Sequence, residues 1–133
     1  MRGIHPTAKA RRRRGAAGSA TVEFVICATV MVLLLLVVVQ VALFFHARAV
    51  ATTAARQGVD RVRVVNGSVG DGVGTANAFL AQAGGGLERR GVHASRSATT
   101  ASVTVEGEVV SVVPGVRLPI DVTVSAPVER ITP

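Results

Sequence analysis

The sequence has no tryptophan, no tyrosine and a single cysteine, Cys27. Because a lone cysteine has no partner within its own chain, an intramolecular disulfide is excluded, and we expect Cys27 to serve as a small apolar side chain. With only four phenylalanines, the chain also lacks the aromatic side chains on which single-stranded nucleic acids stack. These absences argue against a disulfide-stabilised domain and against a nucleic-acid-binding module.

The excess of basic residues is concentrated at one end of the chain. The formal net charge is +7, but six of the fifteen Lys and Arg residues precede Gly18, and the others nearly balance the eight acidic residues. Lys and Arg beside a transmembrane helix stay on the cytoplasmic side. We therefore interpret the cluster of Arg11, Arg12, Arg13 and Arg14 as a topology signal, and we predict no nucleic-acid partner.

A long uncharged run follows this basic segment. Phe24 to Phe45 contains only Thr29 and Gln40 as appreciably polar residues. As a helix these roughly 22 residues extend about 33 Å, enough to cross the hydrocarbon core of a bilayer. The sequence thus predicts a single-pass membrane protein, with a basic cytoplasmic leader over residues 1–18 that lacks regular structure and with its C-terminal part outside the cytoplasm.

The helical pattern continues beyond the apolar run. Small and apolar residues recur every three or four positions from Ala47 to Val65, and a polar stripe that includes Arg56 and Asp60 lies on another face. We therefore expect an amphipathic stem that ends near Asn66-Gly67, so that residues 19–66 form one transmembrane helix with its stem.

The last part, residues 67–133, is predicted to be a small extracytoplasmic α+β domain. We expect a loop up to Gly74, a short helix over 76–83 capped by Thr75 and ended by three glycines, and a hairpin that turns near Glu106-Gly107-Glu108. The clearest strand is 120–128, where apolar and polar residues alternate. Pro114, Pro119 and Pro127 restrict these strands to short or edge positions.

The predicted fold class is therefore α+β: a long N-terminal transmembrane helix with an amphipathic stem, followed by a small antiparallel sheet. Phe79 is the only aromatic residue after His46. Because so few large side chains are available, we expect the core of this domain to be marginal alone and to gain stability by packing against neighbouring proteins.

No group of residues carries a recognisable chemistry. The histidines, His5, His46 and His93, are scattered, with no Cys or carboxylate cluster at metal-ligand spacing. The glycines of "GDGVGT" are not followed by the Lys-Ser/Thr pair of a phosphate-binding loop, and no serine lies in a nucleophile elbow. We therefore predict a protein that is not an enzyme and that holds no metal or cofactor.

The start of the apolar run carries the informative pattern. A basic segment is followed by Gly18, then Ser19, and then Glu23-Phe24 at the head of the apolar residues. This spacing resembles the class III signal of type IV pilin-like proteins, in which a prepilin peptidase cuts after a glycine and glutamate occupies the fifth mature position. The resemblance implies cleavage between Gly18 and Ser19, and a role for Glu23 and Phe24 in docking and assembly.

A second match lies downstream in "FFHARAVATTAARQGVDRVRV". It is similar to the TadE-like family of tight-adherence pilus proteins, and Arg48, Ala54, Ala55, Arg56 and Gly58 carry the likeness. The resemblance implies a pilin-like fold, stem packing through Arg48, Arg56 and Gly58, and a minor pilin or pseudopilin of a Tad/Flp-type pilus or secretion system. Its implied partners in a hetero-oligomer are the Flp-type major pilin, a TadF-like protein, the Tad assembly platform and the prepilin peptidase.

Two other interpretations remain open. Ala47-Arg48-Ala49 has the A-x-A form of a signal-peptidase site, and a cut there would release a small soluble domain. The apolar run is longer than that of a signal peptide, which favours retention in the membrane. A single-pass, membrane-anchored binding module of another kind is the second alternative.

Overall fold

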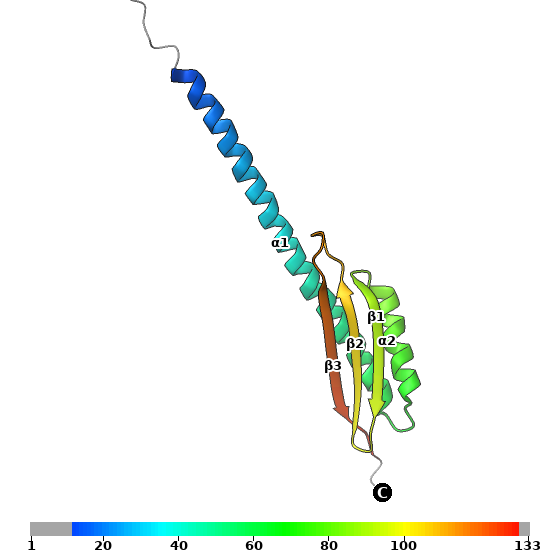
Figure 1. The fold of residues 1–133 in the computed structure, drawn as a ribbon. Helices are drawn as coiled ribbons and strands as arrows, with labels where there is room; N and C mark the ends of the chain where they lie inside the picture. The colour runs from blue at the N-terminus through cyan, green and yellow to red at the C-terminus, as the bar shows by residue number, and fades with distance from the viewer. Residues whose placement is uncertain (1–11, 131–133) are drawn as a thin grey trace, which may run out of the picture. The chain divides into compact units, whose positions relative to one another are not determined.

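The computed structural model describes residues 12–130. The chain divides into two compact units, of which the first ends at Val38 and the second begins at Val39. Helix α1 belongs to both units, and the second unit holds every other element, which is the α+β arrangement that the sequence predicted (Figure 1). The elements in order are α1 (Arg12–Arg63), α2 (Val69–Ala83), β1 (Leu87–Arg96), β2 (Thr100–Val109) and β3 (Leu118–Pro127).

Helix α1 is 52 residues long and runs through both the apolar run and the stem. Neither glycine nor proline, the two residues least favourable inside a helix, occurs between Ser19 and Gln57. After Arg63 the chain turns: the N–H of Gly67 bonds to the carbonyl of Val64 at 2.9 Å, and Asn66 has a φ of 65°. The predicted helix end near Asn66-Gly67 is confirmed.

The start of α1 differs from the prediction. We expected residues 1–18 to lack regular structure, whereas the helix begins at Arg12. Arginine and alanine, which dominate residues 12–18, are among the best helix formers, so the helix continues N-terminal to the apolar run. Residues 1–11, including Arg11, lie outside the described part.

Helix α2 also begins earlier than predicted. Thr75 was expected to cap it, but Ser68 does so: its Oγ accepts a hydrogen bond from the N–H of Asp71 at 3.0 Å. Three glycines that suggested a loop are therefore helical. The predicted end is confirmed, since the helix stops at Ala83 and the N–H of Gly84 bonds to the carbonyl of Leu80.

Gly72, one of these glycines, lies where α2 crosses α1 and has no room for a side chain. A Cβ placed on Gly72 would lie 2.2 Å from Cγ2 of Val62 and 2.9 Å from the carbonyl oxygen of Gly58. A Cβ on Gly58 would in turn lie 3.0 Å from the carbonyl oxygen of Gly72 and 3.2 Å from Val103. The backbones of α1 and α2 thus meet directly at these two glycines. Helix α1 also lies close to β2 at Val103, so the crossing requires residues without a side chain.

The sheet has the order β1-β2-β3, and both pairings are antiparallel. The predicted turn at Glu106-Gly107-Glu108 is wrong, because β2 runs through it and the β1–β2 turn lies at Ser97–Thr99 instead. Gly107 marks a close contact: a Cβ there would lie 2.8 Å from Cγ of Leu87. β1 was not predicted, since its polar residues and the bulge between Glu88 and Gly91 interrupt any alternation.

Strand β3 confirms the clearest prediction. Ile120 is buried and Val122, Val124 and Ala126 are half-buried, whereas the residues between them are exposed. Pro119 and Pro127 lie on this strand, and it is an edge strand, as proline in a sheet requires.

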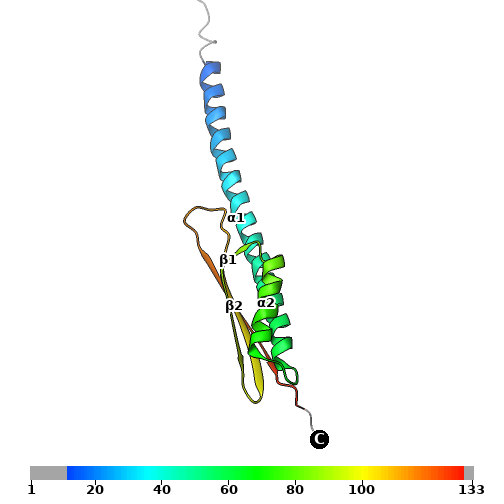
Figure 2. The ribbon, with the colours of Figure 1, turned by 90° about the vertical axis from the view of Figure 1, so that its right-hand side faces the viewer.

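The core of the second unit lies between the sheet and the two helices, which cover the same face of it (Figure 2). Alanine dominates the contribution of α1, because small side chains let the helix approach the valine-rich sheet closely. Phe79 is partly buried and packs against this core. The buried apolar residues are Ala47, Ala51, Ala54, Ala55, Val59, Val62, Ala76, Leu80, Leu87, Ala101, Val103, Val105, Val109 and Ile120.

Candidate assembly site

Most of the described apolar residues of the first unit are exposed along α1. The part of α1 that starts at Gly18 contains an 18-residue window with a mean hydropathy of 3.0, none of which is buried. Large apolar side chains are exposed along it, from Val22 at 60% and Phe24 at 71% to Val38 at 64%. By length and composition this helix can cross a membrane, and such an exposed apolar surface suits lipid or other apolar helices rather than water.

The residues of the predicted pilin signal lie at the beginning of this apolar surface. Gly18, Ser19, Glu23 and Phe24 are all exposed, and open space surrounds the Cα of Gly18. Ser19 and Glu23 are four residues apart on a helix and therefore lie on the same face. Glu23 takes part in none of the ion pairs formed among the described residues. The geometry thus places a carboxylate and the predicted new N-terminus together on an uncovered helix.

The predicted topology signal is only partly described. Arg11 lies outside the described residues, and Arg12, Arg13 and Arg14 form the first turn of α1, where the structure describes the backbone alone. Their role in orientation therefore stays a prediction.

The stem residues fall into two groups. Gly58 is buried at the crossing of α1 with α2 and packs within its own chain. Arg48 and Arg56 are exposed on the opposite, polar face of α1. Asp60, on the same polar stripe as Arg56, pairs with Arg63, whose Nε lies 2.9 Å from the carboxylate. Arg48 and Arg56 are thus the stem residues that a partner could reach.

Sequence reasoning missed two polar residues that tie the second unit together. Gln40 is only 7% exposed, and its Oε1 accepts hydrogen bonds from the N–H of Val112 at 2.9 Å and from Ser111 Oγ at 3.2 Å. The signal that could have revealed it is its polarity within an apolar run. Arg96 of β1 donates to the carbonyls of Val62, Val64 and Gly67 at the end of α1, and nothing in its sequence neighbourhood indicates this.

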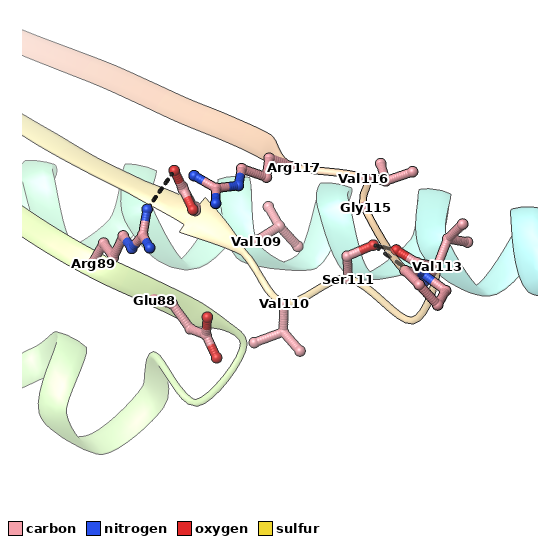
Figure 3. A pocket seen from close by; sticks show the side chains of 11 residues that line it. Glu88, Arg89, Val109, Val110, Ser111, Val113, Gly115, Val116 and Arg117 are labelled. Carbon is pink, nitrogen blue, oxygen red and sulfur yellow. Dashed lines mark hydrogen bonds and ion pairs between the residues drawn. The ribbon is translucent and has the colours of Figure 1, made fainter.

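A surface pocket of about 410 Å³ lies where β1 and β2 meet the β2–β3 loop (Figure 3). Its charged residues are Glu88, Arg89, Glu108 and Arg117, and Arg89 pairs with Glu108 at 3.5 Å. Within residues 12–130 no three His, Cys, Asp or Glu side chains gather as they would around a metal ion. This exposed pair is a surface interaction with little energetic weight, and the pocket offers no nucleophile with an adjacent base.

Comparison with known protein families supports the TadE-like resemblance that the sequence of α1 suggested. Residues 18–60 match the family model described as TadE-like protein, about a third of the 133-residue chain. Searches of curated proteins and of solved structures gave no match. The matched segment starts at Gly18 and includes Glu23, Arg48, Arg56 and Gly58. The TadE-like resemblance is thus confirmed over residues 18–60, the segment that contains the apolar part of α1 and its stem.

Proposed function

We propose that this chain is a minor pilin or pseudopilin, a structural assembly component of a Tad/Flp-type pilus or secretion system. The observation that carries the proposal is Glu23, a carboxylate on an uncovered apolar helix, five residues after Gly18. A charge in a bilayer costs a few kcal/mol or more, so such residues are usually retained for a function.

Assembly gives Glu23 a partner. Cleavage after Gly18 leaves a free ammonium on Ser19, close to the same end of the apolar helix. Within one chain the helix dipole favours Glu23 there and disfavours the ammonium. Between chains, the carboxylate of an assembled subunit receives the ammonium of the incoming one. The pair lowers the cost of burying both charges and sets the axial register of the two helices.

The orientation and partners follow from the same proposal. Residues 1–18, with the cluster Arg11–Arg14, face the cytoplasm, and the second unit lies on the other side of the membrane. The chain assembles as a hetero-oligomer with the Flp-type major pilin and a TadF-like protein, after processing by the prepilin peptidase and through the Tad assembly platform. Phe24 packs between neighbouring helices, and Arg48 and Arg56 face partner subunits.

The stem supports retention in the membrane over release as a soluble domain. Ala47, the first residue of the A-x-A sequence, is 2% exposed and belongs to the core of the second unit. α1 is helical through Ala49, so a signal-peptidase cut there would remove part of the core. The experiments that test the proposed function therefore measure assembly with partner proteins in the membrane, not release of a soluble domain.

Replacing the carboxylate of Glu23 by an amide is expected to abolish assembly. Glu23→Gln keeps size and polarity, so insertion and accumulation in the membrane stay near normal. Co-purification with pilin partners falls at least about tenfold, equivalent to about 1.4 kcal/mol, and pili are lost. Quantitative pull-down from detergent-solubilised membranes and pilus counts measure this.

Glu106→Gln is the matched control, because Glu106 is an exposed carboxylate on the outer face of β2. We expect it to assemble like the wild type. If Glu23→Gln also assembles normally, the pairing of Glu23 with a neighbouring chain is wrong.

The processing site gives a second prediction. Intact mass and N-terminal sequencing of the native membrane protein are expected to show a start at Ser19. Gly18→Leu blocks the cut without disturbing the helix, because no other atom lies near Gly18. A start at Val50 would instead show release by signal peptidase, and an uncut Met1 would leave a membrane-anchored module of another kind.

A further inference from the structure

The loop between β2 and β3, residues 110–117, has an unusual composition for a surface segment. No charge occurs from Val109 to Val116. The loop itself holds four valines, at positions 110, 112, 113 and 116, and Ser111 is its only polar residue before Arg117. Val112 and Val116 are each 40% exposed. The loop thus exposes apolar side chains in a segment that carries no charge before Arg117.

The backbone of this loop makes its hydrogen bonds inside the protein. The N–H of Val110 bonds to the carbonyl of Gly86 at 3.0 Å, and the N–H of Val112 bonds to Gln40 Oε1. Ser111 Oγ accepts from the N–H of Val113 and donates to its carbonyl, as drawn in Figure 3. Internal satisfaction of peptide groups is what a backbone requires where water is scarce.

Gln40 fixes this loop against a helix surface that is itself apolar. Val39, Val41 and Phe45 are 39%, 49% and 64% exposed, so the beginning of the second unit combines apolar side chains from α1 and from the loop. Burying the polar side chain of a glutamine costs free energy that hydrogen bonds must offset. Here it accepts two hydrogen bonds from the loop.

We propose that the β2–β3 loop lies in the interfacial layer of the lipid bilayer and forms a second contact between this protein and the membrane. The loop binds α1 at Gln40, only two residues along the chain from Val38, where the first unit ends. Arg117, exposed at the end of the loop, is placed to meet lipid phosphates, which attract basic side chains near a membrane surface.

The proposal also shifts the lipid-facing segment. If Gln40 and the loop lie at the membrane surface, residues 18–39, about 33 Å of helix, cross the bilayer in place of Phe24 to Phe45. Glu23 then lies about three residues, or roughly 5 Å, inside a hydrocarbon core about 30 Å thick.

Quenching by brominated lipid tests this placement. The full chain with Cys27→Ala receives a single cysteine at Val112, Val116 or Thr99, is labelled with an environment-sensitive fluorophore and is reconstituted into phosphatidylcholine vesicles. Thr99 is the control, because it is exposed in the β1–β2 turn at the opposite end of the sheet. Bromine atoms on the upper part of the acyl chains are expected to quench labels at 112 and 116 at least about twofold more than at 99.

Equal quenching at all three positions would overturn the proposal. A label at position 112 whose emission is blue-shifted but not quenched by bromine would also overturn it, if the blue shift grows as the ratio of protein to lipid is raised. A second copy of the chain would then cover the loop. The readout needs membrane insertion but no pilus, so it is independent of whether Glu23 pairs during assembly.

Discussion

Replacing Gly72 by alanine is expected to lower the free energy of unfolding of the second unit by about 3 kcal/mol, the upper part of the range for overpacked cores. The added Cβ would meet Val62, which is fully buried, and the backbone of Gly58, so neither neighbour can move aside cheaply. For a unit of this size the midpoint of thermal unfolding falls by about 12–24 °C. Circular dichroism of the full chain in detergent measures the transition.

Gly74 offers a matched control within the same helix. No atom lies within 4 Å of a Cβ added there, so Gly74→Ala places the same methyl group in open space. Since alanine is a better helix former than glycine, the variant is expected to be more stable by about 0.5–1 kcal/mol. Equal effects at Gly72 and Gly74 would show that helix propensity, and not the crossing with α1, determines the result.

The second large effect concerns Arg96. Its guanidinium donates to carbonyls at the end of α1 that have no partner within the helix, and its positive charge lies at the negative end of the helix dipole. Arg96→Gln is expected to cost about 2 kcal/mol, because the part-buried carbonyls of Val62 and Gly67 lose a charged hydrogen-bond donor. The same thermal unfolding experiment measures the loss.

Two variants distinguish capping from loss of charge. Arg96→Lys keeps the charge but lacks the planar group, so its stability is expected to lie between the wild type and the glutamine variant. Arg89→Gln removes an arginine from the same strand whose ion pair with Glu108 is exposed, and this costs less than about 1 kcal/mol. If Arg89→Gln and Arg96→Gln are equally destabilising, Arg96 does not cap the helix.

The features with a strong local signal could be predicted from the sequence. Helix α1 follows from an uninterrupted run of apolar residues, its end from Asn66-Gly67, and β3 from strict alternation. The candidate site of Gly18, Ser19 and Glu23 depends on spacing along one helix, so it too is visible without a structure. What these features share is a signal carried by the local order of residues: an apolar run, a turn pair, an alternation or a fixed spacing.

The features that were missed depend on contacts between distant segments. From the sequence alone, Gly72 is typical of a loop and Gly107 of a turn. In the structure each lies in a regular element, where it gives room to a distant residue, Gly58 for Gly72 and Leu87 for Gly107. The roles of Gln40 and Arg96 exist only through backbone groups that come much later or earlier in the chain. Local propensity carries no trace of such tertiary contacts, and they override it.

The end of α1 has a consequence for the order in which the chain becomes stable. Its last carbonyls receive their hydrogen bonds from Arg96 and from the N–H of Glu129, which bonds to the carbonyl of Arg63 at 2.9 Å. A ribosome makes α1 before it makes Arg96 and Glu129. Until the hairpins have formed and closed this long loop, which is the slow kind of step in folding, the terminal turn of the helix stays open to fraying. The end of α1 is thus completed only after a segment that lies more than 60 residues later in the chain has been made.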